Sequence, residues 1–270
     1  MLYLQSKISY SGGILIKVGV IGAQGKMGKT VVSAVLNDNE LELVCAVDKF
    51  NVGFEIAPSI KIQDDIKKAL IETKPDIVVD FTQPSSIFEN IKTYLDLNVK
   101  SVIGTTGLKK EQLEEIEKLS NQKNTGVLIA PNFSIGAVLM MKFATVASKY
   151  FDNAEIIEFH HNQKKDAPSG TAIKTAQMML ENKDCFKLGN CDETETIEGS
   201  RGGNYESIQI HSVRMPGFVA SQEVIFGSDG QTLKIHHDTI NRECYMSGVL
   251  LAVKYLYSNN NYTYGLENIL

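Results

Sequence analysis

The sequence has few cysteines, no long apolar run and no excess of basic residues, and each shortage excludes a class of protein. Its four cysteines are scattered over 270 residues, which favours a reduced, cytoplasmic setting over a disulfide scaffold. No apolar run approaches the roughly 18 residues of a membrane span. With a net charge of −5, the chain has no overall basic field that would attract nucleic acid or anionic membranes. We therefore expect neither partner.

The spacing of cysteines and histidines argues against a metal site. Cys185 and Cys191 are separated by five residues in a polar segment, outside the two-to-four spacing of a zinc knuckle. The pairs at 160–161 and 236–237 are adjacent histidines on predicted strands, so the two rings of each pair point to opposite faces. We expect no bound metal.

A glycine-rich turn follows an almost unbroken apolar run, Ile14–Ile21, of the kind found in a strand buried on both faces. Gly22, Gly25 and Gly28 allow a tight turn and a close approach to a pyrophosphate, while the free N–H groups of the helix that follows point at the anion. The turn predicts a dinucleotide site, although Gln24 stands where the commonest fingerprint has its second glycine. The alternative is a glycine-rich turn without a ligand.

A carboxylate stands where such a site needs one. The predicted strand Leu43–Val47 ends at Asp48, which is 20 residues after Gly28 and suits hydrogen bonds from an adenosine ribose. Lys49 follows directly, and its cation suits a 2′-phosphate.

Strand and helix patterns alternate through the first half of the chain. This alternation predicts an α/β fold with a Rossmann-type doubly wound parallel sheet, whose ligand lies beyond the carboxyl ends of the strands. Asp80–Gln83 and Gly104–Gly107 fall at such ends. The predicted elements after Asp48 are a helix at Asp64–Glu72, a strand at Ile77–Val79, a helix from Pro84 to about Leu95, a strand at Ser101–Ile103, a helix at Lys110–Leu119 and a strand at Val127–Ala130.

After Ala130 the pattern predicts a second α+β domain with a mixed sheet. It opens with an apolar stripe at helical spacing that we expect in the core: Leu139, Phe143, Val146 and Tyr150. We expect a dinucleotide-binding domain at 1–131, beginning with an extension at 1–13, a substrate-binding and oligomerisation domain at 132–239, and a helix within 240–270 that returns to the first domain. The later predicted elements are strands at Ala154–Phe159, Ile208–Val213, Gln222–Phe226 and Thr232–His237, and helices at Thr171–Leu180 and Ile240–Leu256.

The densest concentration of reactive side chains is Glu158–Thr171, which carries two histidines and two lysines ahead of a Pro-Ser-Gly-Thr turn. Pro168 disfavours helix at the preceding residue, so a helix begins near Ser169 and presents unpaired N–H groups to the loop. With Lys164 and Lys165, this predicts a compact site for a small carboxylate. A capped helix after a solvated basic loop is the alternative.

Together these segments resemble the dihydrodipicolinate reductase family. GAQGKMG, DFTQP, GTTG, PNFSIGA and EFHHNQKKDAPSGTA occur in that family's order and spacing, and the resemblance covers about Ile16 to Tyr257. It implies an NADH- or NADPH-dependent oxidoreductase that reduces 4-hydroxy-tetrahydrodipicolinate, a cyclic dicarboxylate, to tetrahydrodipicolinate in diaminopimelate and lysine biosynthesis. It also implies a homotetramer built through the β-rich domain.

The resemblance further implies roles for individual residues. His160 matches the family's general acid, Lys164 matches the lysine assigned to the substrate and to proton transfer, and His161 matches a neighbour lining the same pocket. The remaining matches are Ser169, Gly170 and Thr171 for a substrate carboxylate; Gly22, Gly25, Lys26, Met27 and Gly28 for the nucleotide turn; Asp48 and Lys49 for ribose and 2′-phosphate; Phe81, Thr82, Gly104, Thr105 and Thr106 for the nicotinamide; and Asn132 and Phe133 for the cofactor.

Two departures from the family pattern stand out. Many members have arginine where Lys26 and Lys49 stand, and lysine lacks the bidentate fork, which leaves the choice between NADH and NADPH open. The strand that contains Val213–Gly217, and with it Arg214, replaces a more glycine-rich version found in some relatives; we expect it to lie away from the matched catalytic residues and draw no functional consequence from it.

Two other functions remain open from the residues alone. A different two-domain dehydrogenase, acting on an aldehyde or a sugar, would share the first domain but usually needs a nucleophilic cysteine or a Lys-Pro pair. A redox sensor would bind the dinucleotide without hydride chemistry. Consumption of NAD(P)H only with the condensation product of aspartate semialdehyde and pyruvate distinguishes the reductase from both.

Overall fold

The structure, a computed structural model, describes residues 15–189 and 192–270, so the N-terminal extension and Cys191 lie outside it. The chain forms two compact units. The first contains the described residues up to Pro131 together with Val249–Tyr264, and the second contains Asn132–Gly248 and Gly265–Leu270. Within the described residues, no helix has the length and apolar character needed to cross a membrane.

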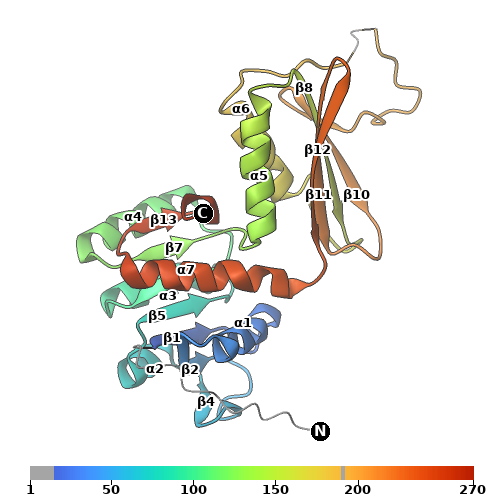
Figure 1. Cartoon of the computed structure of the whole chain (residues 1–270). Coiled ribbons are helices and arrows are strands. Elements are labelled where there is room, and N and C mark those ends of the chain that lie inside the picture. Colours follow the sequence, from blue (N-terminus) through green and yellow to red (C-terminus); the bar gives the residue numbers. More distant parts are fainter. Residues whose placement is uncertain (1–14, 190–191) are drawn as a thin grey trace. The chain divides into compact units, whose positions relative to one another are not determined.

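The first unit is built on an eight-stranded sheet in the order β13-β7-β6-β5-β1-β2-β4-β3 (Figure 1). All neighbours run parallel except β3 and β4, which form a hairpin at the edge. The predicted Rossmann-type doubly wound sheet is therefore confirmed. The strands are β1 (Ile16–Ile21), β2 (Leu41–Val47), β3 (Glu55–Ala57), β4 (Ile60–Gln63), β5 (Ile77–Asp80), β6 (Lys100–Ile103), β7 (Val127–Ile129) and β13 (Tyr262–Tyr264).

Helices cover this sheet because its central strands are apolar on both faces. α2 (Ile66–Thr73), α3 (Pro84–Asp96) and α4 (Lys110–Lys123) pack into one core with alternate strand residues such as Ile103 and Ile129. The strand residues between them, such as Val102 and Leu128, are equally buried and face the opposite side. α1 (Lys26–Asn37) and α7 (Met246–Ser258) supply that side.

The second unit is built on a mixed five-stranded sheet, as predicted, in the order β12-β11-β8-β10-β9. β8 and β10 are parallel, whereas the other pairs are antiparallel. α5 (Ile135–Ser148) and α6 (Gly170–Leu180) pack on the sheet, and Ala144 and Ala176 join its apolar residues in one core. The strands are β8 (Asn153–His160), β9 (Gly203–Tyr205), β10 (Ile208–Arg214), β11 (Ala220–Ser228) and β12 (Gln231–Thr239).

The expected core stripe on α5 is wrong. Phe143, Val146 and Tyr150 are 56%, 58% and 78% exposed, while the buried face carries smaller or flexible residues such as Met140 and Ala144. α5 is apolar almost all round, so helical spacing predicted the helix but could not select the face that is buried.

The boundary of the last helix also differs from the prediction. Ile240 is 85% exposed and precedes a 3₁₀ helix, η1 (Arg242–Tyr245), so α7 begins only at Met246. The Asn241 side chain accepts a hydrogen bond from the Glu243 amide and starts this turn. A second short 3₁₀ helix, η2 (Leu266–Asn268), follows β13.

Candidate active site

In the first unit, the glycine turn is held against the end of β2. The amides of Gly22 and Ala23 both donate to the Val47 carbonyl, at 2.8 and 3.1 Å. A Cβ at Gly28 would lie 2.0 Å from the Gly22 carbonyl oxygen, so only glycine lets α1 start this close to the turn. The first amides of α1 have no partner within the helix, so this turn has the donors that the predicted anion site requires.

Asp48 ties this turn to the loop after β2. Its Oδ2 accepts from the Gln24 amide at 2.8 Å and its Oδ1 accepts from the Phe50 amide at 3.0 Å. Each carboxylate oxygen can accept a further bond, so the predicted ribose contact stays chemically open. Lys26 and Lys49 are exposed.

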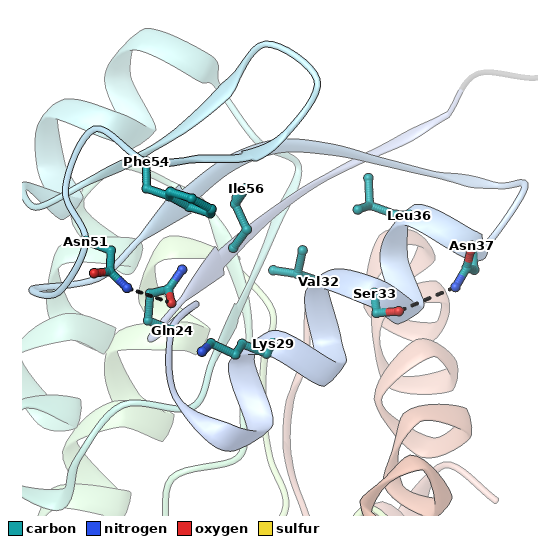
Figure 2. Close-up of a pocket in the computed structure, with 9 residues that line it drawn as sticks. All are labelled: Gln24, Lys29, Val32, Ser33, Leu36, Asn37, Asn51, Phe54 and Ile56. Carbon is teal, nitrogen blue, oxygen red and sulfur yellow. Dashed lines mark hydrogen bonds between the residues drawn. The ribbon is translucent and has the colours of Figure 1, made fainter. Parts of the chain in front are cut away.

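A groove lies beside this carboxylate, between α1 and β3. Its cavity volume is about 530 Å³. Gln24 lies at one end of the groove, where its Oε1 accepts from Asn51 Nδ2 at 3.1 Å (Figure 2). Sequence reasoning missed the groove because β3 was not predicted. Its other lining residues are Lys29, Val32, Ser33, Leu36, Asn37, Phe54 and Ile56.

A buried carboxylate shapes the loop after β5. Asp80 is fully buried and accepts from the Thr82 amide at 2.7 Å, Asn90 Nδ2 at 3.0 Å and the Tyr94 hydroxyl at 2.6 Å. Burial raises the pKa of Asp80, and these hydrogen bonds oppose that rise. The bonds fix the backbone of Phe81 and Thr82.

The predicted nicotinamide loop packs closely on this segment. A Cβ at Gly104 would lie 2.0 Å from Cε1 of the Phe81 ring, so any side chain there would require that ring to move. The Thr105 hydroxyl is buried and has no hydrogen-bond partner among the described residues. A polar group of a ligand would satisfy it, which fits a carboxamide. Thr106 is exposed and borders a cavity of about 90 Å³ together with Thr105.

In the second unit, the predicted anion site lies at the start of α6. Ser169 is the buried N-cap, and its Oγ accepts from the Ala172 amide at 3.2 Å. Gly170 and Thr171 open the helix, where amides have no partner within the helix. The Ser169 hydroxyl hydrogen remains available to a ligand.

The loop before this helix carries the predicted cation. Lys164 Nζ contacts both oxygens of Asp166, at 2.8 and 2.9 Å, and this bond lowers the pKa of Asp166. His161 is exposed and accepts a hydrogen bond from the Gln163 amide at Nδ1. A substrate carboxylate reaching Lys164 would compete with Asp166.

His160 sits in a network that the sequence did not predict. Its Nδ1 lies 2.5 Å from Oε2 of the fully buried Glu158, and Arg214 donates to both oxygens of that carboxylate at 2.8 and 2.6 Å. Burial alone would raise the pKa of Glu158, but the hydrogen bonds from His160 and Arg214 outweigh it and lower the pKa to about 2.

The expectation that Arg214 lies away from the predicted catalytic residues is therefore wrong. β10 pairs with β8 in parallel, and the register sets Arg214 opposite His160. This pairing joins segments more than fifty residues apart, so no local pattern could disclose it.

Asn132 and Phe133 lie in the second unit, just before α5. Asn132 Oδ1 accepts from the Ser134 amide at 2.8 Å, and Phe133 is buried. Ser134 caps α5, and its Oγ lies 3.2 Å from Nε2 of His237. The two predicted cofactor residues thus belong to the capped start of α5.

Two family models together match most of the chain. Residues 16–133 match the family model described as "Dihydrodipicolinate reductase, N-terminus", and residues 136–270 match "Dihydrodipicolinate reductase, C-terminus". The 4-hydroxy-tetrahydrodipicolinate reductase of Listeria innocua is 50% identical over 94% of this chain and 100% of its own length. The enzyme of that name from Syntrophomonas wolfei is 48% identical over 94% of this chain and 98% of its own length.

A solved structure is similar over nearly the whole chain. It is a dipicolinate-bound dihydrodipicolinate reductase from a Paenisporosarcina species. It is 43% identical, has a TM-score of 0.89, and the match covers 95% of this chain and 100% of that one.

Proposed function

Because this chain belongs to the dihydrodipicolinate reductase family and is an oxidoreductase, we propose that it reduces 4-hydroxy-tetrahydrodipicolinate to tetrahydrodipicolinate in diaminopimelate and lysine biosynthesis. The observation that carries the proposal is the proximity of His160 to the start of α6. Glu158 accepts hydrogen bonds from both His160 and the Ser169 amide. A proton donor and a carboxylate-binding helix start therefore share one anchor.

The first unit would hold the cofactor, NADH or NADPH. When bound, the reduced nicotinamide supplies a hydride. The first amides of α1 bind the pyrophosphate, and Asp48 accepts from the adenosine ribose. Lys26 and Lys49 attract a 2′-phosphate, whereas Asp48 repels it. Since these opposing contributions lie near the surface, we expect both nucleotides to be used.

The second unit would hold the substrate. The free amides at Gly170 and Thr171 and the Ser169 hydroxyl bind one carboxylate, and Lys164 binds the other charged group. Dipicolinate, the molecule bound to the Paenisporosarcina reductase, is a planar ring that carries two carboxylates, as the proposed cyclic substrate does. This supports a cyclic dicarboxylate as the substrate.

His160 would supply the proton that the reduced substrate requires. Its Nδ1 is engaged with Glu158, which leaves Nε2 to donate. The ammonium group of Lys164 stabilises the negative charge that develops on the substrate. Both groups come from the loop and strand directly before α6.

We also propose a homotetramer formed through the second unit, in the cytoplasm. An apolar groove of about 690 Å³ lies between α5 and β12, lined by the exposed side chains of Phe143, Val146, Tyr150 and Leu233. Exposed apolar patches of this kind mark interfaces. Analytical ultracentrifugation tests the assembly, and a Phe143→Asp variant that sediments as the wild type does would contradict this interface.

The proposed cytoplasmic location is supported by the cysteines. Cys45, Cys185 and Cys244 are free thiols, which suit a reducing compartment.

The experiment that tests the activity follows NAD(P)H consumption with the condensation product of aspartate semialdehyde and pyruvate. We expect His160→Gln to lower kcat by roughly two orders of magnitude with little change in cofactor affinity. Lys164→Ala is expected to impair both turnover and substrate binding. His211→Gln is the matched control, because that histidine also pairs with a glutamate of β8, Glu155, and should retain wild-type rates. Wild-type kinetics in both test variants would contradict the assignment.

A further inference from the structure

We propose that Glu158, held by Arg214, is a positioning residue that sets the orientation and the protonated nitrogen of His160. The proposal rests on the proposed function, because it assumes that His160 donates the proton. It assigns a role to two residues outside the predicted site. Glu158 would then also hold the catalytic histidine and the carboxylate-binding start of α6 in a fixed arrangement.

The positions of the three side chains follow from the sheet. Glu158 and His160 are two residues apart on β8, so they project from the same face. Arg214 pairs with His160 across the parallel β8–β10 ladder and reaches the carboxylate of Glu158 with both terminal nitrogens. A bidentate contact of this kind fixes the plane of the carboxylate as well as its position.

The Glu158 carboxylate is saturated with donors. Oε2 accepts from His160 Nδ1 and Arg214, and Oε1 accepts from Arg214 and, at 3.2 Å, from the Ser169 amide. An ionised carboxylate accepts hydrogen bonds and donates none, so the proton between the two groups belongs to Nδ1 of His160. Nε2 is then the only nitrogen of that ring that can gain and lose a proton at the substrate.

The same carboxylate fixes the helix start relative to the acid. Its bond to Ser169 holds the N-cap of α6, and Arg214 additionally donates to the Asp166 carbonyl at 2.9 Å, which secures the loop between them. The distance between His160 and the amides of Gly170 and Thr171 therefore depends on Glu158. A shift of about 1 Å between a proton donor and the groups that position its substrate lowers the rate of the chemical step severely.

A purely structural ion pair is the competing interpretation, and the chain offers a matched control for it. Glu155 lies on the other face of β8 and also contacts an arginine and a histidine, Arg201 at 2.6 Å and His211 at 2.8 Å. Glu155→Gln therefore removes the same kind of carboxylate from the same strand, away from His160.

The experiment compares Glu158→Gln with Glu155→Gln. We expect Glu158→Gln to lower kcat by about 10- to 100-fold, a part of the 10²–10⁴-fold that general acid catalysis contributes. The KM and the Kd of dipicolinate in the presence of NADH should change less than about threefold, because the amide oxygen of the glutamine can still accept from the Ser169 amide and hold the helix start. The basic limb of the kcat–pH profile should move to lower pH, because the carboxylate that stabilises the imidazolium is gone. Glu155→Gln should leave kcat and the profile unchanged. A profile that does not move in Glu158→Gln would overturn the proposal.

A double variant separates this proposal from the proposed function. If Glu158 acts through His160, adding Glu158→Gln to His160→Gln lowers kcat no further than His160→Gln alone. Multiplicative losses would overturn the positioning role. If His160→Gln itself has wild-type rates, the proposed function of His160 fails first. If Glu158→Gln does not fold, Glu158→Asp replaces it: this variant keeps the charge but withdraws it by one methylene, and wild-type turnover beside an impaired His160→Gln would overturn the proposal.

Discussion

Replacing Gly28 with alanine tests the geometry on which cofactor binding depends. The added Cβ would lie 2.0 Å from the Gly22 carbonyl oxygen and 2.8 Å from Cα of Ala23. Both neighbours are backbone atoms, so no side-chain rotation relieves the overlap. Either α1 or the turn has to move.

The size of the effect follows from the cost of overpacking. Inserting one methyl group into a packed site typically costs about 1–3 kcal/mol. The turn is held to β2 at Gly22 and Ala23, and α1 is packed on the sheet, so the cost is divided between lost stability and a displaced turn. We expect Tm to fall by a few degrees and the Kd for NADH to rise by about 10- to 100-fold.

The assay combines thermal unfolding with calorimetric titration of NADH. Gly227→Ala is the control, because a Cβ there finds its nearest atom at 3.9 Å, an ordinary contact, and it should leave Tm and NADH affinity unchanged. A Gly28→Ala variant that keeps both its Tm and its NADH affinity would refute the close approach of α1 to the turn.

Three further predictions concern charged and polar side chains. kcat/KM for NADH and NADPH should lie within about a hundredfold of each other, with Asp48→Ala shifting the ratio toward NADPH and Lys49→Ala toward NADH; unchanged ratios in both variants would remove these residues from the ribose. Thr171→Val should raise the Kd of pyridine-2,6-dicarboxylate (dipicolinate), measured by calorimetry with NADH present, and should weaken its competitive inhibition. The reason is that a hydroxyl donor is lost while the shape of the side chain is kept. The pKa of Glu158 is about 2 instead of its ordinary 4.5, so at pH values above 4.5 its ionisation contributes about 3 kcal/mol to the free energy of unfolding. This contribution is lost as pH falls from 4.5 toward 2. The free energies of unfolding of wild type and Glu158→Gln, measured with urea, should therefore come closer together as pH falls from 6 to 3. A constant difference between the two free energies would contradict the ionised pair.

The sequence predicted the fold because the information it needed is local. The apolar runs that became β1 and β5 are buried on both faces, and the alternation with helices left only a doubly wound parallel sheet. The short strands β3, β4, β9 and β13 were missed, because they are partly exposed and lack the continuous apolar run by which the equally short β5, β6 and β7 were predicted. On α5, the apolar surface was continuous and the buried face was chosen by tertiary packing.

The predicted site has the same division between local and distant information. His160, Lys164 and Ser169 lie within ten residues of one another, and motif and spacing were enough to find them. Arg214 was not found, because its contact with Glu158 depends on the pairing of β8 with β10. Glu158 lies within the segment Glu158–Thr171, but its burial depends on tertiary packing of α6 and Arg214 around it, which no local pattern specifies.

The burial of Glu158 and Arg214 is the last argument for their functional role. Withdrawing two charges from water is expensive, and apolar residues of similar volume often stabilise a protein as well or better. The arginine side chain is only 18% exposed and the carboxylate is fully buried, so this pair carries most of that cost. The Arg201–Glu155 pair on the opposite face is about one-third exposed and avoids most of it. An apolar replacement at Glu158 would leave Nδ1 of His160 and the Ser169 amide without their acceptor, whereas the carboxylate serves both at once. We infer that this pair is retained for the arrangement of the acid and the helix start.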